Sequence, residues 1–349
     1  MIALLRRRQK CRTLPYLNPG HCLVQETKES SMPVWFSERS AYMATRISLH
    51  AGCLAVRFLR RQWLYGFSDT VASIGFYLFR GFRTRSVKNV CVALGEQLDE
   101  NAVRDIVRRS LRNFFRDCVE IGIALVVSGN ELRSEIPVTG REHLDAALAK
   151  GNGTILLSGH LGNFFLIGTR LALEGYPVHV LVNQPSHGQF ARLMDDYRLK
   201  VRQKTIHARP RPEALRELGQ VLRSNGLALL IADEYRRGSG ILVPFFGRSV
   251  LARRGPATLA LRTGAAVVPT YLVRDGERQL KLIIEPELEL VRRERNKAEI
   301  RENTLRITQW LERTVRAYPD QWNWMTIHWQ DALEAPRVSK EQPVQHANY

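Results

Sequence analysis

The sequence predicts an α/β fold, with a mixed, mostly parallel central sheet flanked by helices and an N-terminal helical membrane-associating segment. Three observations predict it. From Val138 onward, short apolar runs alternate with longer segments of helical period. Between residues 41 and 135 the pattern is helical. Hydrophobic residues make up 44% of the 349 residues and charged residues 25%, the composition of a chain that buries a core.

Residues 1–40 show no sustained helical or strand period. Two interpretations stay open: a disordered leader, or a start codon placed too early, since Met32 and Met43 both precede better-patterned sequence. The chain then divides into a helical membrane-associating region at 41–135, an α/β domain at 136–335 and a tail at 336–349 that we expect to be disordered.

Residues 41–82 have the features of a segment that binds a membrane surface. An amphipathic run ends at Arg60 and Arg61, and an aromatic-rich run of 17 residues, 63–79, follows. It contains Asp69 and is shorter than the ~20 apolar residues of a transmembrane span. Flanking basic and aromatic residues are typical of a helix lying in the membrane surface, with a buried core helix as the alternative. We expect residues 46–82 to bind lipid, with these arginines at lipid phosphates: Arg57, Arg60, Arg61, Arg80, Arg83 and Arg85.

A long helix is predicted over residues 98–127, with Asp99 or Glu100 near its N-terminus. Its apolar stripe is expected to comprise Ile106, Leu111, Phe114, Phe115 and Cys118.

The elements beyond residue 138 follow from their patterns. Strands are expected at 154–159, 178–182, 227–232, 266–273 and 279–285. Helices are expected at 164–175, 190–201, 212–226, 255–264 and 296–319. Strands separated by helices of this length imply a largely parallel, covered sheet.

Active residues in such a sheet gather where strands end and helices begin. The run LLSGHLGNFF places His160 directly after a buried strand, between Gly159 and Gly162. Histidine ionises near neutral pH, which suits removal of a proton from a hydroxyl, and the glycines allow a substrate to approach closely. The alternative is a histidine that only caps the following helix.

Two further junctions carry charged residues. Asp233 and Glu234 end the strand at 227–232, where an acid could orient a histidine. Arginines near these junctions suit phosphate binding, two of them directly before a helix N-terminus. An ordinary solvated loop is the competing interpretation. The candidate substrate-binding arginines are Arg236, Arg237, Arg253 and Arg254.

The net charge of +18 indicates an anionic partner, which could be nucleic acid, an anionic membrane or a phosphorylated substrate. Residues 1–61 alone hold eleven basic and three acidic residues, a net of +8. Basic and aromatic residues do not interleave as in an RNA-binding motif, so no nucleic-acid partner is expected. The five cysteines form no CxxC pair, and no metal site or cofactor is expected. We interpret the tryptophans near the C-terminal end as packing or interfacial contacts.

The order and spacing of several short segments resemble the lipid A biosynthesis acyltransferase family, within the lysophospholipid acyltransferase group, over roughly residues 60–330. The segments are Arg83-x-Arg85-x-x-x-Asn89-Val90, Gly140-Arg141-Glu142-His143-Leu144, Ser158-Gly159-His160-Leu161-Gly162-Asn163, Val243-Pro244-Phe245-Phe246-Gly247, and Thr263-Gly264-Ala265 before Val268-Pro269.

The resemblance implies transfer of a fatty acyl group from a thioester of acyl carrier protein or coenzyme A to a hydroxyl of a membrane lipid. It implies work at the cytoplasmic face of a bacterial inner membrane, with anionic lipids as partners. His160 would be the base and Asn163 would lie in the substrate site. Independently of the resemblance, we expect backbone N–H groups of 161–163, at the start of a helix, to stabilise the oxyanion.

One departure from the family pattern concerns the catalytic acid. The family has Asp or Glu five positions after the histidine, and this chain has Phe165 there. We expect Asp233, ahead of Glu234, to orient His160 instead. The alternative function is a catalytically weak or inactive relative that binds membranes.

Overall fold

The computed structural model describes residues 38–95, 97–183, 188–235, 240–276, 279–294, 296–325 and 327–329. Almost all of the expected leader and the whole expected tail lie outside these described residues, as do the candidate site residues Arg236 and Arg237.

The central sheet has seven strands in the order β1-β9-β8-β2-β5-β3-β4. Neighbouring strands are parallel except for the antiparallel pair β8–β9. The predicted mixed, mostly parallel sheet is therefore confirmed. The strands are β1 (Val138–Thr139), β2 (Thr154–Ser158), β3 (Val178–Val182), β4 (Lys204–His207), β5 (Leu227–Ile231), β8 (Ala266–Asp275) and β9 (Gln279–Ile284).

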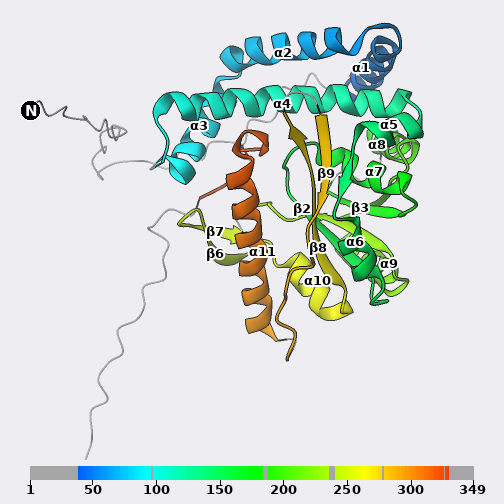
Figure 1. Cartoon of the computed structure of the whole chain (residues 1–349), viewed down its shortest axis with the longest axis vertical. Helices are drawn as coiled ribbons and strands as arrows, with labels where there is room; N and C mark the ends of the chain where they lie inside the picture. The colour runs from blue at the N-terminus through cyan, green and yellow to red at the C-terminus, as the bar shows by residue number, and fades with distance from the viewer. Residues whose placement is uncertain are drawn as a thin grey trace, which may run out of the picture.

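Helices cover both faces of the sheet, because the central strands are apolar on both sides. One hydrophobic cluster joins one face to α3, α4, α9, α10 and α11, and a second joins the other face to α5, α6 and α7. Figure 1 shows α4 lying across one end of the sheet, with α2 on its outer side. The helices are α1 (Glu38–Phe58), α2 (Arg61–Leu78), α3 (Arg80–Leu94), α4 (Glu100–Val126), α5 (Gly129–Glu135), α6 (Arg141–Leu148), α7 (Ile167–Leu173), α8 (Gln189–Lys200), α9 (Arg211–Arg223), α10 (Gly255–Thr263) and α11 (Lys297–Ala317), with short 3₁₀ helices η1 (Phe164–Leu166) and η2 (Pro319–Gln321).

The long helix α4 begins as predicted, with the Asp99 side chain accepting a hydrogen bond from the Ala102 amide at 2.8 Å. The predicted apolar stripe is only partly correct. Ile106 and Leu111 are buried, whereas Cys118 is exposed and Phe114 is 54% exposed. The stripe is interrupted because Phe114 lines a cavity instead of packing in the core.

Helices α1 and α2 form the outermost layer above α4 (Figure 1). Helix α2 packs on α4 through one face, which includes Leu64, Tyr65 and Phe76. Its opposite face is apolar yet solvent-exposed. None of the helices in the described ranges combines the length and apolar character of a transmembrane span. The exposed residues of this face, which we term the α2 apolar face, are Trp63, Phe67, Ile74, Tyr77 and Leu78.

A separate antiparallel hairpin, β6 (Ile241–Phe245) and β7 (Arg248–Ala252), packs against α11. The sequence analysis predicted no strand in this segment. Its two-residue turn has positive φ at both Phe246 (51°) and Gly247 (70°), the geometry that closes a tight hairpin. The Phe-Gly turn is a weaker signal than Asn-Gly or Asp-Gly, which is why the hairpin is hard to predict.

Candidate active site

His160 and Asp233 lie side by side because of the register between two central strands. Strand β2 pairs in parallel with β5, and Ser158 is the partner of Ile231. His160 and Asp233 each follow that last pair by two residues. Both therefore emerge at the same carboxyl edge of the sheet, where ligands of open α/β sheets bind.

The Asp233 carboxylate makes two hydrogen bonds with His160. Its Oδ1 lies 2.7 Å from His160 Nδ1, and its Oδ2 accepts the His160 backbone N–H at 2.7 Å. The Asp233 side chain is fully buried, whereas the His160 side chain is 26% exposed. The contact that the sequence analysis predicted is therefore present. It fixes the imidazole with Nδ1 toward the carboxylate.

Trp322 is a third member of this group that the sequence analysis missed. Its indole Nε1 donates to Asp233 Oδ2 at 2.8 Å, and its side chain is fully buried. Burial alone would raise the pKa of Asp233. The attraction of His160, together with hydrogen bonds from His160 and Trp322, outweighs it and holds the pKa below the ordinary value. The sequence gives little indication of this role, because an apolar aromatic residue such as tryptophan is first interpreted as part of the hydrophobic core.

Phe165, at the position of the family acid, does not replace that acid chemically. Phe165 is 45% exposed and stacks on Phe164, with ring centroids 4.1 Å apart. Phe164 in turn meets the His160 ring edge to face at 5.0 Å. The two phenylalanines therefore give His160 an apolar wall, and the carboxylate comes from the neighbouring strand.

One expectation about the loop after His160 is wrong, and a second is wrong for two of its three residues. Asn163 is fully buried, with its amide donating to Glu120 Oε2 at 2.9 Å, so it lies behind the cavity wall and not in the substrate site. The backbone N–H of Gly162 donates to the Gln321 carbonyl at 2.8 Å, and that of Asn163 to the Leu272 carbonyl at 2.9 Å. Because these two amides donate hydrogen bonds to carbonyls within the protein, they do not stabilise an oxyanion.

A cavity of about 1400 Å³ opens beside His160. Phenylalanines from α3 and the residue before it, from α4 and from η1 line it, together with aliphatic side chains from α4, β3, α9, β5 and α10. The space is large enough for a ligand with a long apolar portion. The lining phenylalanines are Phe79, Phe82, Phe114, Phe115, Phe164 and Phe165, and the leucines are Leu111, Leu181, Leu215, Leu218, Leu229, Leu230 and Leu259.

Arginines add positive charge to the cavity wall. Arg253 and Arg254 both line it, as predicted for the arginines directly before a helix N-terminus, and Arg253 Nε lies 3.9 Å from Glu234 Oε2. Arg198 and Arg211, which the sequence analysis did not select, line the same cavity. Arg211 begins α9, which follows β4 after three residues. Because β4 was not predicted, this strand-to-helix junction was not recognised in the sequence. Within the described ranges, no cluster of His, Cys, Asp or Glu has the composition of a metal site.

The fold and the site together define an α/β enzyme with a histidine–carboxylate pair beside an apolar, arginine-containing cavity. A model of the bacterial lipid A biosynthesis acyltransferase family matches residues 37–331, and the chain belongs to that family of acyltransferases, which act on lipid acceptors.

The curated relatives carry one name. Phosphatidylinositol mannoside acyltransferases from two strains of Mycobacterium tuberculosis are each 27% identical over 301 residues, covering 84% of this chain and 91% of the relative. The protein of that name from Mycolicibacterium smegmatis is 26% identical over 229 residues, covering 64% of this chain and 72% of the relative.

Proposed function

We propose that this enzyme transfers a fatty acyl group from an acyl thioester to a hydroxyl of a membrane glycolipid, with His160 as general base. The observation that carries the proposal is the pairing of His160 with the buried Asp233 at the edge of a large apolar cavity. The relatives named for a mannoside acceptor support a sugar-bearing lipid as the acceptor.

The chemistry follows from the histidine's orientation. Because Asp233 holds Nδ1, the imidazole carries its proton there and Nε2 accepts the proton of the acceptor hydroxyl. The oxygen attacks the thioester carbonyl, a C–O bond forms, and the C–S bond breaks. The proton then passes from Nε2 to the leaving thiolate. The thioester is already activated, so the step needs no acyl-enzyme. Asp233 stabilises the imidazolium that forms in between.

The donor is an acyl thioester of coenzyme A or acyl carrier protein, both of which carry phosphate. Arg253 and Arg254 lie at the cavity with Arg198 and Arg211, so a phosphorylated carrier would meet positive charge there. The aliphatic part of the cavity suits the acyl chain. Arg236 and Arg237, which we also predict to bind substrate, fall outside the described residues.

The acceptor is proposed to reach the site from a membrane surface. The α2 apolar face is exposed, and three exposed arginines, Arg57, Arg60 and Arg80, flank α2 in the chain. Each basic residue near an anionic leaflet contributes about 1 kcal/mol. We place the enzyme at the cytoplasmic face of a bacterial inner membrane, with anionic lipids as its partners.

Three of the arginines first assigned to lipid phosphates have partners within the protein. Arg61 is paired with Glu131 and Glu135. Arg83 donates to the carbonyls of Phe76 and Tyr77, and Arg85 contacts His328. The assignment to lipid is therefore kept only for Arg57, Arg60 and Arg80.

The experiment is a turnover assay with purified full-length protein, acyl-coenzyme A or acyl carrier protein thioester, and vesicles containing a mannosylated phosphoinositide or a lysophospholipid. We expect acyl transfer to the glycolipid. Transfer only to the lysophospholipid would contradict the acceptor class. No transfer from either donor to either acceptor, in protein shown to be folded, would favour the inactive membrane-binding relative that Phe165 suggests.

A further inference from the structure

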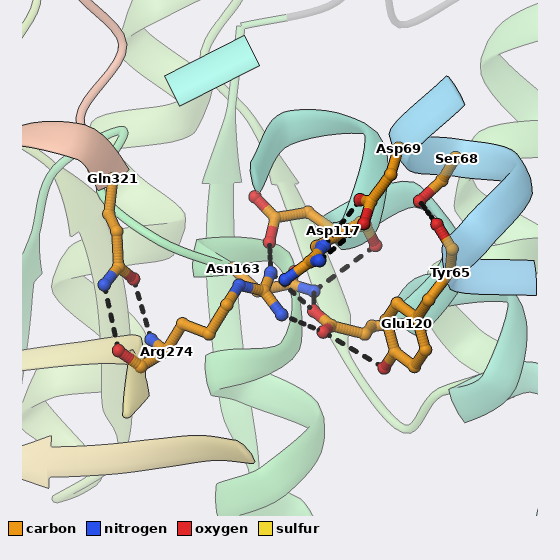
Figure 2. A network of polar contacts seen from close by, with 9 residues as sticks. Tyr65, Ser68, Asp69, Asp117, Glu120, Asn163, Arg274 and Gln321 are labelled. Atoms are coloured by element: carbon orange, nitrogen blue, oxygen red, sulfur yellow. Dashed lines mark hydrogen bonds and ion pairs between the residues drawn. The ribbon is translucent and has the colours of Figure 1, made fainter. Parts of the chain in front are cut away.

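A buried charged cluster lies directly behind the His160 loop, and the acyl-transfer step leaves it without a function (Figure 2). Glu120 on α4 is 4% exposed and Arg274 at the end of β8 is 6% exposed. Arg274 Nη1 donates to Glu120 Oε1, and its Nη2 donates to Glu120 Oε2 at 3.3 Å and to Asp117 Oδ1 at 2.7 Å. One guanidinium thus joins α4 to the sheet.

The cluster reaches the catalytic loop by two routes. Through the first, Glu120 Oε2 accepts the side-chain amide of Asn163 at 2.9 Å, three residues after His160. Through the second, the Arg274 backbone exchanges two hydrogen bonds with the Gln321 side chain, at 2.7 and 2.9 Å. The Gln321 carbonyl then accepts the Gly162 amide at 2.8 Å. Both routes end within three residues of His160.

The numbers of positive and negative groups in this cluster differ from those of a simple ion pair. Arg274 is one cation facing two carboxylates, those of Asp117 and Glu120. Burial, reinforced by the negative charge of Glu120, raises the pKa of Asp117 well above its usual value. Buried ion pairs often stabilise a fold no better than apolar residues of similar volume, and their best-attested value is to specify one geometry.

We propose that Glu120 and Arg274 are positioning residues that hold the His160 loop in the geometry in which the imidazole meets Asp233. They act through Asn163 and Gln321, without touching the reacting atoms. The inference rests on the proposed acyl transfer, because it assigns these residues an effect on that reaction. The cluster also connects α4, against which α2 packs, with the loop that carries His160.

The test compares two variants of the cluster with a control at a neighbouring ion pair that joins α2 to α4. Glu120→Gln keeps the side-chain size but places amide hydrogens against the donors of Asn163 and Arg274. Asn163→Ala removes the first route to the loop, and it supplies the comparison if Glu120→Gln fails to fold. The control is Asp69→Asn, which weakens the pair between Asp69 and the buried Arg116, at 2.6 and 2.7 Å, and so affects the contact between α2 and α4.

We expect Glu120→Gln and Asn163→Ala to lower kcat about tenfold or more, because a small displacement of a catalytic group is costly, while KM changes by less than about twofold. Asp69→Asn is expected to lower the melting temperature with kcat within about twofold of wild type. Equal retention of kcat in all three variants would overturn the proposal, as would a loss of kcat in Asp69→Asn matching that in the cluster variants.

A second measurement separates this proposal from the proposed function. The ¹⁵N resonance of His160 Nδ1, assigned by its loss in His160→Gln, reports the hydrogen bond to Asp233 without turnover. We expect Glu120→Gln and Asn163→Ala to shift this resonance, and Asp69→Asn to leave it in place. If wild-type protein transfers no acyl group but the resonance shifts as described, the proposed function fails and the positioning role stands. Unchanged resonances in both cluster variants would contradict the positioning role.

Discussion

At the scale of single residues, the carboxylate that contacts His160 is that of Asp233, and it does not come from the position of Phe165, where the family pattern places an acid. The family pattern supplies the acid five residues after the histidine, and here that position lines the cavity as an aromatic ring. The acid comes from β5, because the register of β5 with β2 brings residue 233 beside residue 160. The proposed acyl-transfer chemistry requires only a carboxylate beside the histidine, whichever segment of the chain provides it.

Asp117 provides a test of the electrostatics beside the site. Its pKa is raised by burial and by Glu120, so the folded state favours the protonated carboxyl. For a carboxyl whose pKa is raised by folding, the contribution to the free energy of unfolding is fully present below the unfolded-state pKa. This contribution is lost as the pH rises through the folded-state pKa. Asp117→Asn, which stays neutral, is therefore expected to melt at a higher temperature than wild type at pH 7 to 8.

The difference between the two proteins is expected to shrink as the pH falls to about 3, below the unfolded-state pKa of about 3.9, because the carboxyl of wild type then becomes protonated in both states. Thermal melts of wild type and Asp117→Asn across this pH range check the prediction. A melting temperature that is lower in the variant at pH 8, or a difference that does not depend on pH, would contradict the assigned cause.

At the scale of elements, the loop after β2 is built by close backbone approach. Gly162 has φ of +53°, and a Cβ placed there would lie 2.1 Å from the Leu272 carbonyl oxygen on β8. Any side chain would therefore push the His160 loop away from the sheet. Gly151 has a similar φ of +77° but faces open space. A side chain at Gly151 therefore carries only the cost of the backbone conformation, without a steric clash.

We expect Gly151→Ala to lower the free energy of unfolding by about 1 kcal/mol, the lower end for a strained backbone. Gly162→Ala is expected to cost at least about 2 kcal/mol more, because overpacking adds to the same strain. Denaturant unfolding of both variants measures the difference. Equal losses would show that the loop does not depend on contact with β8.

The α2 apolar face makes a second prediction at this scale. Leu78 in this face is 71% exposed, and Leu199 on α8 is 69% exposed, so the two leucines form a matched pair. Leu78→Ala is expected to weaken binding to anionic vesicles about tenfold, corresponding to about 1.4 kcal/mol of lost apolar burial. Leu199→Ala is expected to bind like wild type. A vesicle sedimentation assay that finds the same loss for both leucines would refute the specific role of α2.

Across the whole molecule, the sequence was sufficient for elements whose pattern is local. The buried runs at β2 and β5 predict central strands, and their carboxyl ends predict His160 and Asp233 as site residues. The short strand β4 and the hairpin β6–β7 were not predicted. Strand β4 has only four residues, and the two strands of the hairpin are joined by a Phe-Gly turn, which is a weak turn signal. Their positions depend on partners elsewhere in the chain.

The parts of the site that the sequence could not predict depend on distant pairings. Arg274 and Glu120 are separated by 154 positions, and Trp322 and Asp233 by 89. Neither pairing has a periodic or spacing signal. For Asn163, the sequence motif led to a wrong prediction. Its place in a motif next to His160 suggests contact with substrate, whereas its side chain points into the protein toward Glu120 (Figure 2).

The most direct test of the central claim is the single-turnover rate of acyl transfer in wild type, His160→Ala and Asp233→Asn, with folding checked by circular dichroism. General-base catalysis contributes about 10²–10⁴-fold, so His160→Ala is expected to lose rate on that order with KM little changed. Asp233→Asn is expected to lose rate as well, since an amide cannot stabilise the imidazolium. Full activity in His160→Ala would contradict the account.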